Sequence, residues 1–564
     1  MLRRSLLLFL GVAACKDGSG PTLRPCTAAG FPVSLAVGQY VAIDPVPDSG
    51  CTVFPANGAL DAEYVVVSQL ATGEPGKTSS FRLTGDTILP AVLSAALAAP
   101  ARADEMLSPA EQFHAFLRHG DETRWRELVP AGGRAFRSGP LLGPAGPPPT
   151  YGSTRQFKVC SRLNCSQFAT VTATALAVKS KVAIFVDNDA PPGGLDATQL
   201  DALADLFDTR LYATDTAAFG VESDIDANSV VLVLMTPVVN RLVTAAECQQ
   251  SGFVAGFFYG ADLEPTFINS NAGEVFYSLV ADPGGTLSCS HSTTSVQRIV
   301  PVTFIHEFQH MISYNQHVLL RGGDGEVLWL NEGFSHYAEE LGGRSFLPAD
   351  PTTFSRFTIG DLFNAYQYLD STDKHFLLPT AGIGSLAERG AAWLFVRYIV
   401  DRYSGGTTVT QWNAFTRQLL QTTATGADNV AAVTGQPFET VVTQWALANW
   451  VSDLPGFAAP AELKYDSWPF RTTYASLNAQ DPTNFPKPYP LTPTQSAGRG
   501  VNLSGTLRAG SGVYHRTLQA PNDAGFTLLF AAGDRGPFST LVLGPGSGPL
   551  DPTLVPRLSV IRIK

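Results

Sequence analysis

The chain has 564 residues, too many for one hydrophobic core, so several compact units are expected. Only 15% of its residues are charged, whereas glycine (52) and proline (40) are plentiful, which is typical of turn-rich modules outside the cell. The formal net charge is -11, and no run of lysine or arginine could follow a phosphate backbone. These features argue against nucleic acid as a partner.

The first 15 residues have the pattern of an export signal. Two arginines precede an apolar stretch that is too short to span a bilayer, and small residues lead into Cys15. Val12-Ala13-Ala14-Cys15 resembles the bacterial lipobox, in which the cysteine is acylated; an ordinary signal peptide with a chance cysteine is the alternative. We therefore expect a signal peptide over 1–15 and an extracytoplasmic protein, anchored to a bacterial membrane or cell surface through lipid on Cys15.

The number of cysteines agrees with export. Without Cys15, six cysteines remain, and an even number in an exported chain indicates disulfides. Several pairings are possible in principle. The pairing that keeps each bridge within one region joins sequence neighbours: Cys26 with Cys51, Cys160 with Cys165, and Cys248 with Cys289.

In chain order, the sequence predicts β structure near both ends. Residues 24–95 contain short apolar runs broken by Gly, Pro and Asp, which predict an N-terminal β-sandwich-like module. Residues 96–150 contain a predicted helix from Ser108 to Leu128, followed by a Pro/Gly-rich linker. Residues 456–564 again alternate short strands with turns, and they predict a C-terminal β-sandwich-like module.

Residues 151–455 are predicted to form the largest unit, a mixed sheet followed by a helical lobe. The predicted strands are 156–160, 169–178, 182–186 and 230–235, with further edge strands at 252–259 and 275–280. The predicted helices are 198–212, 302–316, 330–341, 387–403, 409–421 and 437–452. The whole chain is therefore expected to be a multidomain α+β protein.

One of these predicted helices contains His306-Glu307-Phe308-Gln309-His310, an H-E-x-x-H motif. Residues four apart on a helix are rotated by about 400°, so both imidazoles lie on one face and can share a metal ion. A zinc ion with imidazole ligands keeps a position for water, and a carboxylate beside that water can take its proton. The motif predicts zinc ligands at His306 and His310 and a general base at Glu307.

A third ligand is expected from the next predicted helix. The segment 329–340 reads W-L-N-E-G-F-S-H-Y-A-E-E, and its Glu332 lies 22 residues after His310. A loop of that length lets the chain turn back, so that the two helices lie side by side. Glu332 would complete a site of two histidines and one glutamate. Glu339 returns to nearly the same helix face and is expected to hydrogen-bond a ligand imidazole.

The segments H-E-F-Q-H-M-I and W-L-N-E-G resemble the gluzincin metallopeptidases, and H-E-F-Q-H-M-I is most similar to the hyicolysin family of secreted bacterial neutral metallopeptidases. The resemblance is specific around residues 300–342. It implies a thermolysin-like or aminopeptidase-like catalytic domain at 151–455, with zinc on His306, His310 and Glu332 and with the adjacent Glu307 as base. The G-x-M-E-N segment of the gluzincin aminopeptidases is absent, which favours an endopeptidase.

The spacing of residues does not identify the group that stabilises the oxyanion. Candidates for this role are His336, Tyr337, Tyr366 and Arg389. His114, on the early helix, has no partner at metal spacing and is expected at the surface.

The segment from Glu222 to Asn228 contains an acidic alternation, with Asp224 and Asp226, that resembles the start of a calcium loop. The glycine and the closing glutamate of an EF-hand are missing, and a polar turn entering a strand is the alternative. Ca²⁺ is therefore a second candidate cofactor beside Zn²⁺.

These features predict a zinc-dependent endopeptidase that hydrolyses peptide bonds of extracytoplasmic proteins through a water molecule activated by Glu307. An extended substrate is expected to lie along the sheet edge at 252–259. Two other interpretations stay open: a surface lipoprotein that binds a structural zinc without turnover, and a zinc hydrolase of a non-peptide amide or ester. An intact Glu307 disfavours the former, because a structural site needs no base.

Overall fold

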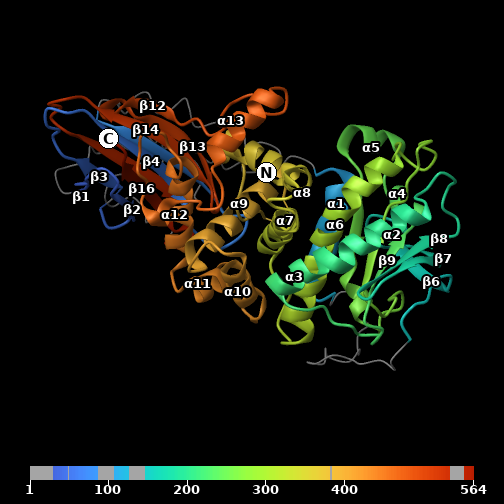
Figure 1. The fold of residues 1–564 in the computed structure, drawn as a ribbon. Coiled ribbons are helices and arrows are strands. Elements are labelled where there is room, and N and C mark those ends of the chain that lie inside the picture. Colours follow the sequence, from blue (N-terminus) through green and yellow to red (C-terminus); the bar gives the residue numbers. More distant parts are fainter. Residues whose placement is uncertain (1–29, 49, 87–106, 126–146, 381–383, 534–551) are drawn as a thin grey trace, which may run out of the picture.

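A computed structural model of the chain describes residues 30–48, 50–86, 107–125, 147–380, 384–533 and 552–564. The expected signal peptide and the lipid site at Cys15 lie outside these residues. Figure 1 shows a β-sandwich, a central group of helices and a mixed sheet, which together form a multidomain α+β protein as the sequence predicts. Among the described residues, none of the helices combines the length and apolar character that a membrane span requires.

The β-sandwich is built from both ends of the chain. Its strands are β1 Phe31–Pro32, β2 Tyr40–Ile43, β3 Cys51–Phe54, β4 Ala62–Leu70, β5 Thr78–Gly85, β12 Thr494–Ala497, β13 Asn502–Arg508, β14 Gly512–Gln519, β15 Phe526–Gly533 and β16 Pro556–Arg562. One sheet has the order β1-β3-β15-β5-β13 and the other β12-β14-β4-β16-β2. The structure thus differs from the expected separate modules at 24–95 and 456–564, because both sheets contain strands from both regions.

Strand β4 shows why the two terminal regions come together. Its side chains are buried along almost the whole strand, and successive side chains of a strand point to opposite faces. Val66 packs in the core of the sandwich, whereas Val65 and Val67 pack in the larger core that includes the helices. A strand that is apolar on both faces must be covered on both, and here distant strands and helices supply that cover.

The second β structure is a six-stranded mixed sheet. Its strands are β6 Thr154–Cys160, β7 Phe168–Val178, β8 Val182–Asp187, β9 Val231–Met235, β10 Gly256–Phe258 and β11 Val275–Ser278. They have the order β10-β11-β9-β8-β7-β6, in which β8, β9 and β11 are parallel. Strand β10 lies at the edge, as the sequence predicts, whereas β11 lies inside the sheet.

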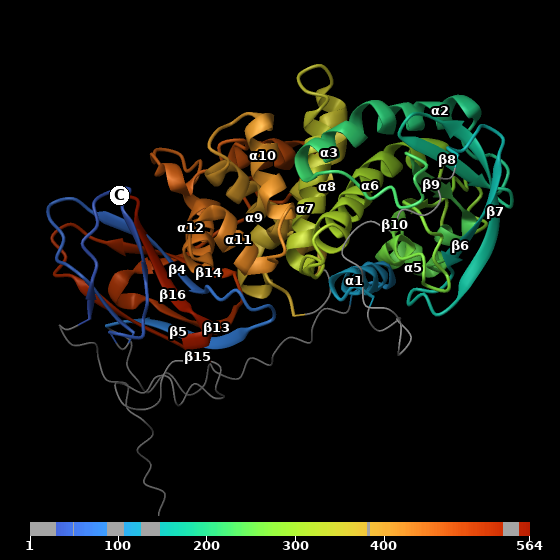
Figure 2. The same cartoon turned by 90° about the horizontal axis from the view of Figure 1, so that it is seen from below.

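One group of helices lies between the two β structures, and other helices lie beside the mixed sheet (Figure 2). They are α1 Pro109–Glu122, α2 Ala197–Leu206, α3 Tyr212–Phe219, α4 Pro237–Asn240, α5 Ala245–Ser251, α6 Thr293–Tyr314, α7 Leu328–Arg344, α8 Pro351–Asp370, α9 Leu386–Tyr403, α10 Val409–Leu420, α11 Gly426–Thr434, α12 Phe438–Val451 and α13 Phe470–Gln480. Helices α3, α4, α5, α8, α11 and α13 were not among the predicted helices, and α13 lies in a region predicted to be β. Helix α8 begins at Pro351, directly after Asp350, whose side chain caps the helix by accepting from the Thr353 N–H. An Asp-Pro pair is a signal for the start of a helix.

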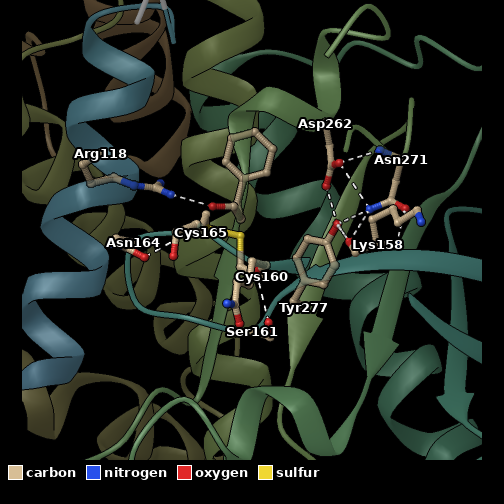
Figure 3. Close-up of a disulfide and its surroundings, with 12 residues drawn as sticks. Arg118, Lys158, Cys160, Ser161, Asn164, Cys165, Asp262, Asn271 and Tyr277 are labelled. Carbon is tan, nitrogen blue, oxygen red and sulfur yellow. Dashed lines mark hydrogen bonds between the residues drawn. A yellow bond between two sulfur atoms is a disulfide. The ribbon is translucent and has the colours of Figure 1, made fainter. Parts of the chain in front are cut away.

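Two of the three expected disulfides lie within the described residues. Cys160 is bonded to Cys165 (Figure 3), and Cys248 is bonded to Cys289. These two pairings are confirmed. Cys26 lies outside the described residues, so its pairing with Cys51 stays a prediction.

Candidate metal centre

The H-E-x-x-H motif lies in the C-terminal half of α6. The helix begins earlier than predicted, because Ser292 caps its first turn by accepting from the Ser295 N–H at 3.1 Å. Ile305, Phe308 and Ile312 pack in the core and hold one face of the helix there. The histidines of the motif lie on a different face, which looks toward α7.

Three side chains that could hold a metal ion converge between α6 and α7. The Nε2 atoms of His306 and His310 are 3.2 Å apart. Carboxylate oxygens of Glu332 lie 3.7 Å from Nε2 of His306 and 3.5 Å from Nε2 of His310. Two ligands of a tetrahedral zinc ion, each about 2.0–2.1 Å from it, are roughly 3.3 Å apart. The residue types and the spacing of their ligand atoms therefore fit zinc.

The other ring nitrogen of each histidine donates a hydrogen bond. His306 Nδ1 donates to Glu339 Oε1 at 2.7 Å, and His310 Nδ1 donates to Asn331 Oδ1 at 3.1 Å. A proton on Nδ1 leaves the lone pair of Nε2 directed at the shared position. Asn331 was not among the predicted site residues, although its place directly before Glu332 is a signal in the sequence.

The pKa shifts of His310 and Glu332 favour the protonation states that a metal needs. Desolvation holds the pKa of His310 well below its ordinary value, so the ring is neutral near pH 7, as a ligand must be. Burial opposes a charge on Glu332, but its contacts with His310 and His306 hold the pKa of its carboxyl well below the usual range. A neutral imidazole and an ionised carboxylate thus face each other before any metal binds.

The carboxylate of Glu307 turns toward the sheet edge and α1. Its Oε2 accepts from the backbone N–H of Phe258 in β10 at 2.9 Å and lies 3.7 Å from Nη2 of Arg118. Its Oε1 is 3.6 Å from Nδ1 of His114. Burial raises the pKa of the Glu307 carboxyl, and the positive charge of Arg118 partly offsets this effect.

Helix α1 connects the two sides of the candidate centre. Toward the mixed sheet, Arg118 donates to the Phe258 carbonyl at 2.8 Å; Figure 3 shows this side chain reaching out from the helix. Toward the helical group, Glu111 pairs with Arg389 of α9 at 3.3 Å. The structure differs here from the sequence analysis, which placed 96–150 apart from the metallopeptidase domain and His114 at the surface. The His114 side chain is only 20% exposed.

The four candidates for stabilising an oxyanion have different surroundings. His336 Nδ1 lies 3.0 Å from the Glu339 carboxylate, and Arg389 is close enough to lower the pKa of Glu332. The hydroxyl of Tyr337 accepts from Arg397 at 3.4 Å, and that of Tyr366 accepts from the Lys487 N–H at 2.7 Å.

His336 and Arg389 therefore act on the candidate centre through its carboxylates, whereas the two tyrosines have partners of their own. Burial opposes a charge on His336, but Glu339 and Asp361 raise its pKa to about 10. Its imidazole is thus positively charged at neutral pH.

Comparison with known proteins gives one informative match. No model of a protein family matches the chain. Over 144 residues, the chain is 28% identical to the neutral metalloprotease ShpI of Staphylococcus hyicus. The match covers 25% of this chain and 31% of that protein, so the chain spans less than a third of the relative. Over that stretch the chain is similar to a metalloprotease, and the similarity supports this class and no finer one.

Proposed function

We propose that the chain is a zinc-dependent peptidase of the gluzincin type, close to the hyicolysin family, and that it acts as an endopeptidase on extracytoplasmic proteins. The observation that carries the proposal is the meeting of His306, His310 and Glu332 at zinc spacing, with Glu307 on the same helix. The similarity to a neutral metalloprotease supports the same class. Lipid anchoring through Cys15 belongs to the proposal.

His306, His310 and Glu332 would hold the zinc ion. When bound, zinc supplies Lewis acidity toward the scissile carbonyl and lowers the pKa of a water molecule. Glu307 takes the proton of the attacking water and passes it to the leaving amine. The Phe258 N–H holds the Glu307 carboxylate in one orientation, and the charge of Arg118 favours its ionised form.

Glu339 and Asn331 orient the two imidazoles through the ring nitrogens that face away from the metal position. Each accepts a hydrogen bond from the Nδ1 of one histidine, which keeps the ring from rotating about its side-chain bonds. These acceptors also make the imidazoles more basic, which strengthens their bond to a metal.

The substrate path follows from the edge position of β10. The Phe258 N–H and carbonyl both point away from β11, to Glu307 and Arg118 respectively. An extended peptide that pairs with this edge needs the same two backbone groups. Substrate binding along β10 would therefore require Arg118 to release the Phe258 carbonyl and Glu307 to release the Phe258 N–H, which frees the Glu307 carboxylate for the attacking water.

The test measures zinc content and casein cleavage of the soluble chain from residue 16 onward. Wild type is compared with Glu307→Gln and with Glu439→Gln, a control on the exposed part of α12. We expect one zinc per chain in all three proteins. Cleavage should fall by about 10²–10⁴-fold in Glu307→Gln alone, because only this variant lacks the base.

Zinc-free protein, or unchanged cleavage by Glu307→Gln, would contradict the proposal. Bound zinc without cleavage of casein by wild type would also contradict it. In that case, hydrolysis of ester or non-peptide amide substrates would indicate the other hydrolase, and no turnover would indicate a lipoprotein with a structural zinc.

A further inference from the structure

The loop between α3 and β9 brings two aspartates close to a glutamate from a distant part of the chain. Asp224 and Asp226 lie in this loop, and Glu274 directly precedes β11. One carboxylate oxygen of each lies within 4.8 Å of the others. Strands β9 and β11 are parallel neighbours, so their amino ends lie at the same edge of the sheet. The sheet therefore assembles a three-carboxylate cluster that the linear sequence does not contain.

Glu274 has an unsatisfied oxygen in this cluster. The residue is 1% exposed. Its Oε1 accepts from the Ile225 N–H at 2.8 Å and from the Ser223 hydroxyl. Its Oε2 is buried and has no hydrogen-bond partner among the residues that the structure describes, and the same holds for Oδ1 of Asp226. A buried carboxylate oxygen without a donor is unfavourable, and a cation among these oxygens would supply the missing partner.

The surrounding groups leave an excess of negative charge. Arg155 Nη1 lies 3.6 Å from Oδ2 of Asp226, the same oxygen that accepts from Asn228 Nδ2 at 2.8 Å. Oδ1 of Asp224 accepts from the Ser229 N–H at 2.9 Å. One guanidinium thus faces three carboxylates, while the remaining donors are neutral. A divalent cation would balance this charge.

Gly273 leaves space for the carboxylates to approach one another closely. A side chain at Gly273 would begin 2.9 Å from Oδ2 of Asp226, so glycine lets this carboxylate lie against the backbone that leads into Glu274. Two oxygens on opposite sides of a calcium ion, each 2.3–2.6 Å away, are separated by up to roughly 5 Å. The observed spread of the three oxygens fits that limit.

We propose that Asp224, Asp226 and Glu274 form a Ca²⁺ site that is separate from the candidate zinc centre. Carboxylate oxygens are the ligands of hard cations, whereas zinc prefers nitrogen and sulfur. Asp224 and Asp226 stand at the spacing of the first ligands of a calcium loop, and Glu274 takes the place of the closing glutamate that the loop lacks. The ion would connect the loop before β9 to the start of β11.

The test titrates Ca²⁺ into the zinc-loaded soluble chain by isothermal titration calorimetry, with zinc filling its own centre. Wild type is compared with Glu274→Gln, Asp224→Asn and the control Asp201→Asn on α2, whose side chain is 57% exposed. We expect one Ca²⁺ per chain in wild type and in the control. Each ligand variant should bind at least about tenfold more weakly, because one of three charged ligands is gone.

A second measurement covers the case in which Glu274→Gln fails to fold. Asp224→Asn keeps the oxygen that accepts from Ser229, so it should fold normally. At a Ca²⁺ concentration that saturates wild type, the Tm of wild type should rise by roughly 5 °C, and that of Asp224→Asn should rise by clearly less. Absence of Ca²⁺ binding to wild type, wild-type Ca²⁺ affinity in both ligand variants, or a preference for Mg²⁺ over Ca²⁺ would overturn the proposal.

Discussion

At the residue scale, two adjacent glutamates of α7 serve different parts of the molecule. Glu339 accepts from His306 at the candidate zinc centre. Glu340 turns to a buried cluster, where it accepts from Trp468 at 2.9 Å and from Arg397 at 3.3 Å. Successive residues of a helix point about 100° apart, so neighbours in sequence reach different partners. Mutating Glu339 and Glu340 one at a time therefore distinguishes an effect on metal binding from an effect on the stability of the fold.

Replacing Glu339 by Gln should weaken zinc binding by about 10–100-fold, because the charged acceptor behind His306 is lost. Replacing Glu340 by Gln should leave zinc affinity unchanged but lower the free energy of unfolding by about 3–5 kcal/mol, because Arg397 stays buried without its full counter-charge. Zinc affinity is measured by chelator competition and stability by urea unfolding. The assignment fails if both variants bind zinc as wild type does.

Asp262 is a buried carboxyl on the sheet side of the molecule. Figure 3 shows that it accepts from the Tyr277 hydroxyl and from the Asn271 N–H. The hydrogen bond from the Asn271 N–H is 2.6 Å long. Burial raises its pKa from 3.8 to about 7. The folded chain therefore holds this proton more tightly than the unfolded chain. The contribution of Asp262 to stability is full below about pH 4 and is lost as the pH rises through about 7.

The variant Asp262→Asn should lack this titration. Between pH 4 and pH 7 its free energy of unfolding should fall by a few kcal/mol less than that of wild type. Urea unfolding at several pH values measures the difference, and Asp201→Asn, with an exposed side chain, should follow wild type. Parallel pH profiles for wild type and Asp262→Asn would show that Asp262 is ionised throughout.

At the scale of elements, α1 is part of the candidate centre although it lies far from α6 in the sequence. Ser108 and Glu111 form a capping box at the predicted start of the helix, so the helix begins with a strong local signal. Its position depends on Arg118, which is 1% exposed and lies between Asp121 and Glu307. The side chain compensates two buried carboxylates and holds the helix against the sheet edge.

Replacing Arg118 by Met should lower the free energy of unfolding by about 3–5 kcal/mol, because Asp121 and Glu307 stay buried without their cation. The control is His119→Ala on the same helix, where a side chain that is 59% exposed should change stability by less than about 0.5 kcal/mol. Urea unfolding measures both. Equal stability of the two variants would show that Arg118 does not hold α1 in place.

At the scale of the whole molecule, the two ends of the chain form one sandwich. Strand β4 pairs with β14 and β16, and β5 pairs with β13 and β15. The N-terminal strands therefore cannot be removed without exposing the edges and inner faces of the C-terminal strands. Assays of peptidase activity should keep residues 30–86 for this reason.

A chain that begins at residue 107 should lose the sandwich. Its C-terminal strands from Thr494 onward should become sensitive to proteases, because β4 and β5 no longer cover them. Limited proteolysis with mass spectrometry detects the cleavage sites, and a chain that begins at residue 30 is the control. Adding residues 30–86 as a separate fragment should restore protection. A protected C-terminal region in the shorter chain would contradict this prediction.

Patterns in the sequence determined the shared face of the two histidines and the disulfide pairings. The spacing of His306 and His310 places them on one helix face, since 3.6 residues make a turn. The disulfide Cys160–Cys165 follows from the closeness of its cysteines in the chain, and Cys248–Cys289 follows from pairing consecutive cysteines within one region. Each of these depends on residues within one region of the chain.

The tertiary structure decided what depends on distant segments. It placed Arg118 and His114 against Glu307, and Glu274 beside Asp224 and Asp226. It also joined the two terminal β regions into shared sheets. An apolar strand must be covered by other residues, and a buried charge must have a partner of opposite charge. The sequence of the strand or of the charged residue does not identify which distant segment supplies that cover or partner. Only the packing of the whole chain makes that choice.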